Sequence, residues 1–211
     1  MSSKPSLRER KKERTRARLI EVSQRLFAEQ GYDATTLEQI CEEAEVSVST
    51  LLLYFESKER LALTPDYDVV AEFRAVIEDP NRTVDTLAAW RAHVEQHARE
   101  GRTNASAYLH HYRFQASSPA LVRGTMALLH QYEEIIAAGL ARDHDVDPDD
   151  LTVRLMATTL VFGDQMAVRR WIAAGGKGDI VASCLAVVDF VSATYPKPGR
   201  RARAVRRAAA R

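Results

Sequence analysis

Two histidines are the most direct candidates for chemistry in this sequence. His93 and His97 are four residues apart, so on a helix both imidazoles lie on one face and could share a metal ion. The order between them is His-Val-Glu-Gln-His, which places the glutamate one position away from its place in the zinc-protease motif. We therefore expect no catalytic zinc site. We interpret the pair as imidazoles that line a cavity or face solvent, and a ligand-sensing metal site is the alternative.

A second group of residues begins like a calcium-binding loop. Asp143, Asp145 and Asp147 have the required alternation, but Pro148 occupies the position that needs glycine and Arg154 the position that needs glutamate. We interpret this run as a solvated loop followed by the start of a helix.

A glycine-rich run at residues 175–178 lacks the spacing and the Ser/Thr of a phosphate-binding loop, so we interpret it as a connection between helices. No local signature supplies a nucleophile, a base and an orienting group together. The sequence thus predicts no catalytic residue, no cofactor and no resident metal, and it gives no positive support to an enzyme.

The strongest signal lies in residues 35–58, which predict two short helices joined by a tight turn and preceded by a basic arm. This is the layout of a helix-turn-helix that reads DNA. Thr35 and Glu38 have the spacing of a capping box, so the first helix is expected to begin here. Its buried face is formed by apolar residues at helical intervals, namely Leu37, Ile40, Cys41 and Ala44.

The second of these helices is expected to read the bases. Residues 45–47 can form the turn, with Ser47 as the N-cap of the helix. The next side chains, Val48, Ser49 and Thr50, are small enough to approach base edges. The apolar anchor behind them is expected to be Leu51, Leu52, Leu53 and Phe55.

The order of residues through this segment resembles the amino-terminal domain of the TetR family of transcriptional regulators. The residues that match the family pattern are Phe27, Gly31, Tyr32, Thr35, Thr36, Ile40, Cys41 and most of the run from Ala44 to Leu61. The sequence departs from the pattern at Glu45 and Ser49, which replace glycines, and at Leu52, which replaces a tyrosine.

The resemblance implies specific contacts with a double-stranded DNA operator. The residues implied to hold phosphates are Thr36, Thr50, Tyr54 and Lys58, and those implied to face bases are Ser47, Val48 and Ser49. In the basic arm, Arg14 and Arg16 are expected to contact the DNA backbone or the minor groove.

Composition and charge agree with a two-module chain. The 211 residues, 45% of them hydrophobic, suit one DNA-reading module and one larger domain. The net charge of +1 conceals basic segments at residues 1–18 and 196–211, and the first of these suits a polyanionic partner.

Cys41 and Cys184 fall in different expected domains, which fits a reducing compartment better than a disulfide. With no signal peptide and no uncharged apolar span, we expect a cytoplasmic protein without membrane contact.

Apolar periodicity and helix breakers predict an all-α chain of about nine helices, with no internal repeat. Besides the pair in residues 35–58, helices are expected at about 8–30, 66–78, 83–100, 102–116, 119–143, 149–174 and 179–195. Gly101 is expected to separate two of them. The expected domains are a helix-turn-helix domain at 1–63, a ligand-binding and dimerisation domain at 64–196 and a basic disordered tail at 197–211.

The last two expected helices carry long apolar faces, which could be simple core. These faces comprise Leu151, Leu155, Leu160, Phe162, Met166 and Trp171 in one helix, and Ile180, Val181, Leu185, Val188, Phe190 and Val191 in the other. In the resembled family such a pair docks against its twin, and a reader of two half-sites needs two copies. We therefore favour a homodimer, with a polar rim formed by Arg154, Asp164, Arg169 and Arg170.

Aromatic and polar side chains mix on the helices between these modules, as in a mostly apolar pocket with a few orienting groups. The expected ligand contacts are Trp90, His93, His97, Tyr108, His111, Phe114 and Tyr132. Such a lining predicts a hydrophobic or amphipathic effector, for example an acyl chain, acyl-coenzyme A or an aromatic acid.

Together these features predict a homodimeric TetR-like regulator, most simply a repressor, that binds a palindromic operator and releases it when a small molecule binds. The alternatives are a metal-sensing repressor that uses His93 and His97, a helical adaptor that does not bind DNA, and a small helical enzyme. A salt-sensitive DNA affinity would separate both kinds of repressor, the one that binds a small molecule and the one that senses a metal, from the adaptor.

Overall fold

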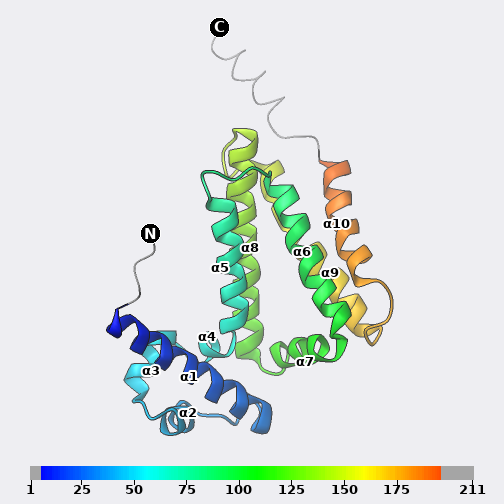
Figure 1. Cartoon of the computed structure of the whole chain (residues 1–211). Helices are drawn as coiled ribbons and strands as arrows, with labels where there is room; N and C mark the ends of the chain where they lie inside the picture. The colour runs from blue at the N-terminus through cyan, green and yellow to red at the C-terminus, as the bar shows by residue number, and fades with distance from the viewer. Residues whose placement is uncertain (1–5, 196–211) are drawn as a thin grey trace. The chain divides into compact units, whose positions relative to one another are not determined.

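The computed structural model describes residues 6–195, and over these residues it contains α-helices and no strands, as expected (Figure 1). The helices are α1 (Leu7–Gln30), α2 (Leu37–Ala44), α3 (Val48–Phe55), α4 (Lys58–Ala62), α5 (Thr64–Glu78), α6 (Thr86–Thr103), α7 (Ala105–Gln115), α8 (Pro119–His144), α9 (Leu151–Ala173) and α10 (Ile180–Thr194). None of the described helices is both long enough and apolar enough to cross a membrane.

The chain divides into two compact units. The first contains the residues up to Asp68 together with Arg113–Thr125, and the second contains Val69–Tyr112 together with the residues from Met126 onward. Helices α5, α7 and α8 therefore contribute residues to both units. The predicted domain boundary after Leu63 stays a prediction, and the predicted tail at 197–211 lies outside the described residues.

The long first helix begins the first unit and contributes to its core. Ser6 caps α1 with a reciprocal pair of hydrogen bonds to Glu9, and Gly31, with φ +87°, ends it. The buried core of α1–α4 is formed by apolar residues that lie at helical intervals, including Leu19, Val22, Phe27, Ile40, Leu51, Phe55 and Leu61.

The first helix of the expected helix-turn-helix begins one residue later than predicted. Thr36, not Thr35, is the N-cap of α2, and its partner in the capping box is Gln39, not Glu38. Thr35 is instead buried, and its hydroxyl donates to the Gly31 carbonyl over 2.8 Å. Of two adjacent threonines, the second caps the helix because the first is used to close the loop after α1.

A short helix, α4, was not predicted as a separate element. It spans Lys58–Ala62 and begins at Ser57, whose hydroxyl accepts a hydrogen bond from the Arg60 amide. Glu56, with φ +64°, turns the chain between α3 and α4. The chain from Leu61 to Ile77 therefore contains the end of α4 followed by most of α5.

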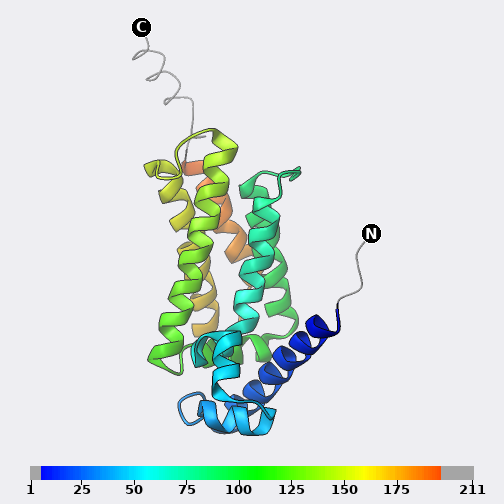
Figure 2. The same cartoon turned by 90° about the vertical axis from the view of Figure 1, so that its left-hand side faces the viewer.

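In the second unit, α10 packs against α9 and α6 (Figures 1 and 2). Gly163 permits the close approach of α9 and α10, because a Cβ there would lie 2.6 Å from the Val187 Cγ1. Gly101 does not separate two helices as predicted. It lies inside α6, where a Cβ would meet the Tyr108 ring at 3.1 Å, and the chain turns at Asn104 instead.

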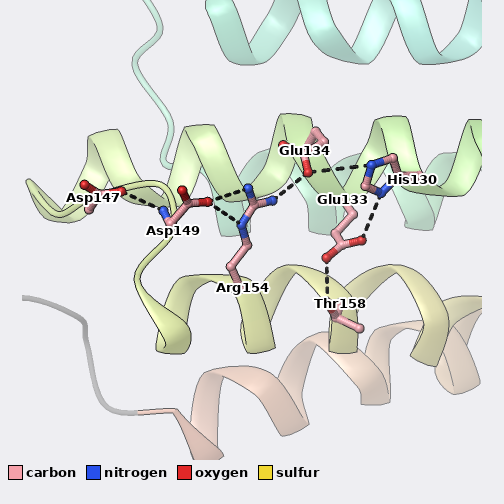
Figure 3. Close-up of polar contacts among 7 residues, drawn as sticks. All are labelled: His130, Glu133, Glu134, Asp147, Asp149, Arg154 and Thr158. Atoms are coloured by element: carbon pink, nitrogen blue, oxygen red, sulfur yellow. Dashed lines mark hydrogen bonds and ion pairs between the residues drawn. The ribbon is translucent and has the colours of Figure 1, made fainter.

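Polar contacts join α8 to the start of α9 (Figure 3). Arg154 donates to Glu134 over 2.7 Å and to Asp149 over 2.8 Å, and the Thr158 hydroxyl donates to Glu133 over 2.8 Å. The acidic run before α9 is a loop and a helix start, as predicted, with Asp150 as the N-cap. Arg154 thus ties that loop to α8.

Candidate DNA-binding and effector sites

The amino-terminal end of α3 is held by a group of three hydroxyls. Ser47 is the N-cap, as predicted, and its Oγ accepts a hydrogen bond from the Thr50 amide over 3.1 Å. The same Oγ lies 2.9 Å from Ser49 Oγ and 2.8 Å from Thr50 Oγ1. The small polar side chains expected to meet DNA are therefore brought together at the start of α3, where they hydrogen-bond to one another.

The turn between α2 and α3 is made by Glu45, in the left-handed conformation with φ 57° and ψ 42°. The Val46 amide donates to the Cys41 carbonyl over 3.0 Å, which closes the turn. A side chain in this conformation costs roughly 1–2 kcal/mol relative to glycine, which the family pattern has here. Glu45 thus makes the left-handed turn without glycine, at a cost in stability.

The apolar anchor of α3 is smaller than predicted. Leu51 and Phe55 are buried, but the exposed fraction of Leu52 is 39% and that of Leu53 is 85%. The prediction that all four residues anchor the helix is therefore wrong for Leu52 and Leu53. They lie with Ser49 on the solvent face of α3, because positions three and four apart share one side of a helix.

The predicted phosphate-binding residues occupy different environments. Arg14 and Thr36 are exposed, and Tyr54 and Thr50 are half-buried. Arg16 is engaged within the protein, since its guanidinium donates to both carboxylate oxygens of Asp68 over 3.0 and 3.2 Å. Whether each of these residues meets a phosphate stays a prediction.

Lys58 has a role inside the first unit that the sequence did not reveal. Its ammonium donates to the Tyr32 carbonyl over 3.0 Å and to the Thr35 carbonyl over 2.9 Å, and it lies 4.2 Å from the centroid of the Tyr32 ring. These contacts join the start of α4 to the loop before α2. A phosphate contact by Lys58 stays a prediction beside this structural role.

In the second unit, several predicted effector residues form one aromatic cluster. His93 Nε2 lies 3.1 Å from the Tyr132 hydroxyl, and its ring lies 5.3 Å from Trp90 and 4.4 Å from His97, measured between centroids. Phe73 completes the cluster at 4.7 Å from His93. Burial, and then the nearby His97, lower the pKa of His93 to about 3, so this imidazole is neutral at physiological pH.

A second cluster surrounds Tyr108, another predicted effector residue. Its ring centroid lies 5.1 Å from that of Tyr112 and 6.0 Å from that of Trp171. Asp164 and Cys184 belong here as well: the thiol hydrogen-bonds to the carboxyl group, while Asp164 Oδ1 is shielded from solvent and has no hydrogen-bond partner. Burial raises the pKa of Asp164 to about 6.

The sequence predicts Asp164 in a polar rim of the dimer, but the structure places its carboxyl group in this buried cluster instead. A single carboxylate inside the apolar run of α9 was the available signal, because a charged residue in such a run either faces solvent or serves a buried site.

Phe114 and His111 are placed differently from the other predicted effector residues. Phe114 lies in the first unit, where its ring is 5.8 Å from Phe27 and 6.4 Å from Tyr32. His111 lies on α7 with its ring 6.1 Å from Tyr112.

Within residues 6–195, no three His, Cys, Asp or Glu side chains gather as a metal ion would require.

A groove of about 670 Å³ runs along α9 and α10. Two large apolar side chains in its lining are exposed: Met166 to 64% and Phe190 to 56%. A groove with large exposed apolar side chains is a candidate surface for interaction with another protein.

The second helix of the helix-turn-helix is exposed and capped by a serine, and the chain has a second helical unit as well. This combination is typical of a DNA-binding regulator. Residues 19–64 match the model of the bacterial regulatory proteins of the tetR family, and residues 84–196 match that of the MftR C-terminal domain. The HTH-type transcriptional regulator TcmR of Streptomyces glaucescens is 31% identical over 175 residues, which cover 79% of this chain and 77% of TcmR. The chain therefore belongs to the tetR family of bacterial regulatory proteins, and it is a transcriptional regulator, not an enzyme.

Solved structures share the fold. The Thermus thermophilus FadR repressor, in complex with lauroyl-CoA, has a TM-score of 0.58 and 20% identity over 83% of this chain and 92% of its own. SmeT, in complex with triclosan, has a TM-score of 0.59 and 17% identity over 88% and 93% of the two chains. At these identities the likeness concerns the fold alone.

Proposed function

We propose that this chain is a homodimeric repressor that binds a palindromic operator through α3 and releases it when a small apolar or amphipathic molecule binds in the second unit. The observation that carries this proposal is the exposed face of α3, presented by a complete helix-turn-helix in a chain of the tetR family.

The groove along α9 and α10 supports the dimer. A helix-turn-helix protein reads two half-sites with two copies, so it needs a self-complementary face. Met166 and Phe190 supply exposed apolar area on the two helices that the resembled family uses for this purpose. Gly163 keeps these helices close, which lets them act as one rigid half of a four-helix interface.

The two aromatic clusters support the effector site. Both mix aromatic rings with few polar groups, namely the neutral His93 imidazole in one and the Asp164 carboxyl in the other. This composition favours a ligand with a large apolar body and a polar group that fixes its orientation. Lauroyl-CoA and triclosan, the ligands of the FadR and SmeT structures, both fit that description.

Release follows if the effector binds better to a conformation that cannot bind the operator. A coupling of ~1–3 kcal/mol changes operator affinity roughly 5- to 150-fold. The segment that we propose to transmit the change is α5, which follows α4 directly in the chain and, like α7 and α8, contributes residues to both units.

The test is a screen with two readouts on the full chain. Acyl-coenzyme A species, fatty acids, triclosan and other aromatics, and Zn²⁺ are tested first for a rise in melting temperature, since a ligand at a hundredfold excess over Kd adds about 2.7 kcal/mol. Compounds that bind are then tested for loss of operator binding. An apolar compound that does both supports the proposal, whereas release by Zn²⁺ alone, abolished by His97→Ala, replaces it with metal sensing.

A further inference from the structure

The exposed face of α3 is apolar at its centre. Leu53 is exposed to 85% and Leu52 to 39%, while the buried side of the helix is already supplied by Leu51 and Phe55. Leu53 contributes little to the stability of the fold, because it buries little area, and Leu52 leaves more than a third of its surface in water. Their position indicates that they are covered by something else.

The hydroxyl and carboxylate groups on this face of α3 lie at the two ends of the helix and not at its centre. The hydroxyls of Ser47, Ser49 and Thr50 lie at its amino-terminal end and hydrogen-bond to one another there. The next residue on the exposed face after the leucines is Glu56, an acid at the carboxy-terminal end. On the face that Ser49, Leu52, Leu53 and Glu56 share, the centre of the helix therefore offers apolar contact and no side-chain hydrogen-bond donor.

In the major groove one base pair matches such a surface. Thymine alone carries a methyl group at the groove edge, and apolar side chains contact it, whereas the edges of guanine and cytosine offer only hydrogen-bonding groups. We propose that Leu53 and Leu52 read thymine methyl groups in each half-site. The proposal rests on the operator binding described above and adds the bases that α3 selects.

The test compares thymine with uracil, which differs by that methyl group alone. The preferred site of the full chain is selected from random duplex DNA, and each dT of a half-site is then replaced singly by dU. Removal of one buried methyl group is expected to lower affinity roughly three- to tenfold at one or two positions and to leave the others unchanged. Restoring the methyl group on the other pyrimidine, as 5-methyl-dC opposite dG, is expected to recover part of the loss.

The variant Leu53→Ala assigns the contact to its side chain. It folds as the parent does, because Leu53 is so exposed, and its melting temperature checks this. It should bind the dT and dU duplexes equally at the position that Leu53 reads, so that the two changes are not additive. Val84→Ala, at an exposed apolar position in the second unit, is the matched control and should keep the full preference for dT.

The outcomes are distinct. If no sequence is selected over random DNA, operator binding itself fails. If a site is selected but dU replaces dT throughout without loss, or Leu53→Ala retains the dT preference in full, operator binding stands and methyl reading is wrong. A selected half-site without A·T pairs likewise overturns it.

Discussion

The Lys58 ammonium donates to the main-chain carbonyl of Thr35 over 2.9 Å, so a residue at the start of α4 holds the loop that precedes α2. Thr35 in turn uses its hydroxyl to close that loop against Gly31. The position of the loop before the helix-turn-helix thus depends on a lysine for which the family resemblance predicts only a contact with a DNA phosphate.

Replacement of Lys58 by methionine should destabilise the free protein. It keeps the apolar stem but removes two charge-assisted hydrogen bonds to carbonyls, a loss of about 1–3 kcal/mol in urea unfolding. Lys11→Met, at an exposed position on α1, is the control and should change stability little. Unchanged stability with a flatter salt dependence of DNA binding would show that Lys58 acts on phosphate alone.

Replacement of Glu45 by glycine should stabilise the protein. Residue 45 keeps its left-handed conformation, which glycine adopts without the steric cost, and the expected gain is about 1 kcal/mol. Glu42→Gly, inside α2, should instead destabilise by a similar amount, because glycine is a poor helix former. Denaturant unfolding of both variants checks the pair, and a loss of stability in Glu45→Gly would contradict the strained turn.

Asp164→Asn should stabilise the protein at neutral pH and not at acidic pH. The pKa of Asp164 is raised from 3.8 to about 6, so below roughly pH 3 the group is protonated in both the folded and the unfolded state, and its burial costs no ionisation free energy. As the pH rises from 3.8 to about 6, the unfolded chain ionises before the folded one, and above pH 6 the full cost of about 3 kcal/mol is present. The variant's advantage should therefore be large at pH 7.5 and small at pH 4.

Measurement of unfolding free energies for both proteins across this range isolates Asp164, since His93 and His97 are present in both. Asp33→Asn, at an exposed position, controls for a general effect of charge. An advantage for Asp164→Asn that does not vary with pH would show that the carboxyl is not buried in solution.

Phe190→Glu should dissociate the proposed dimer. A charge in the lining of the α9–α10 groove is expected to raise the dimer dissociation constant at least about 30-fold, the effect of losing one anchor residue. Val84→Glu, at another exposed apolar position, should leave the dimer intact. Sedimentation equilibrium measures both, and a Phe190→Glu variant as dimeric as the parent would place the interface elsewhere.

Much of the fold could be predicted from the sequence because its signals are local. The apolar spacing of the long helices, Ser47 as an N-cap and the loop before Asp150 each depend on a few neighbouring residues. The position of α4 was missed because five residues are too few for a period to appear.

The remaining errors concern choices that only tertiary contacts decide. Either threonine of Thr35-Thr36 can cap α2, and burial of the first selects the second. Four apolar residues among Leu51–Phe55 show no period, so the sequence could not reveal that Leu53 faces solvent. The environment of Asp164 depends on Cys184 and Tyr108, which are distant in sequence.

The most direct test of the account is the affinity of the full chain for its selected duplex and for a scrambled duplex, measured by equilibrium binding over a range of KCl concentrations. We predict binding as a dimer, a preference for the selected duplex of at least ~10³-fold, and a log K that falls linearly with log[KCl] by ~0.9 per phosphate neutralised. Equal affinity for the two duplexes, or an affinity that does not change with salt, would contradict the account.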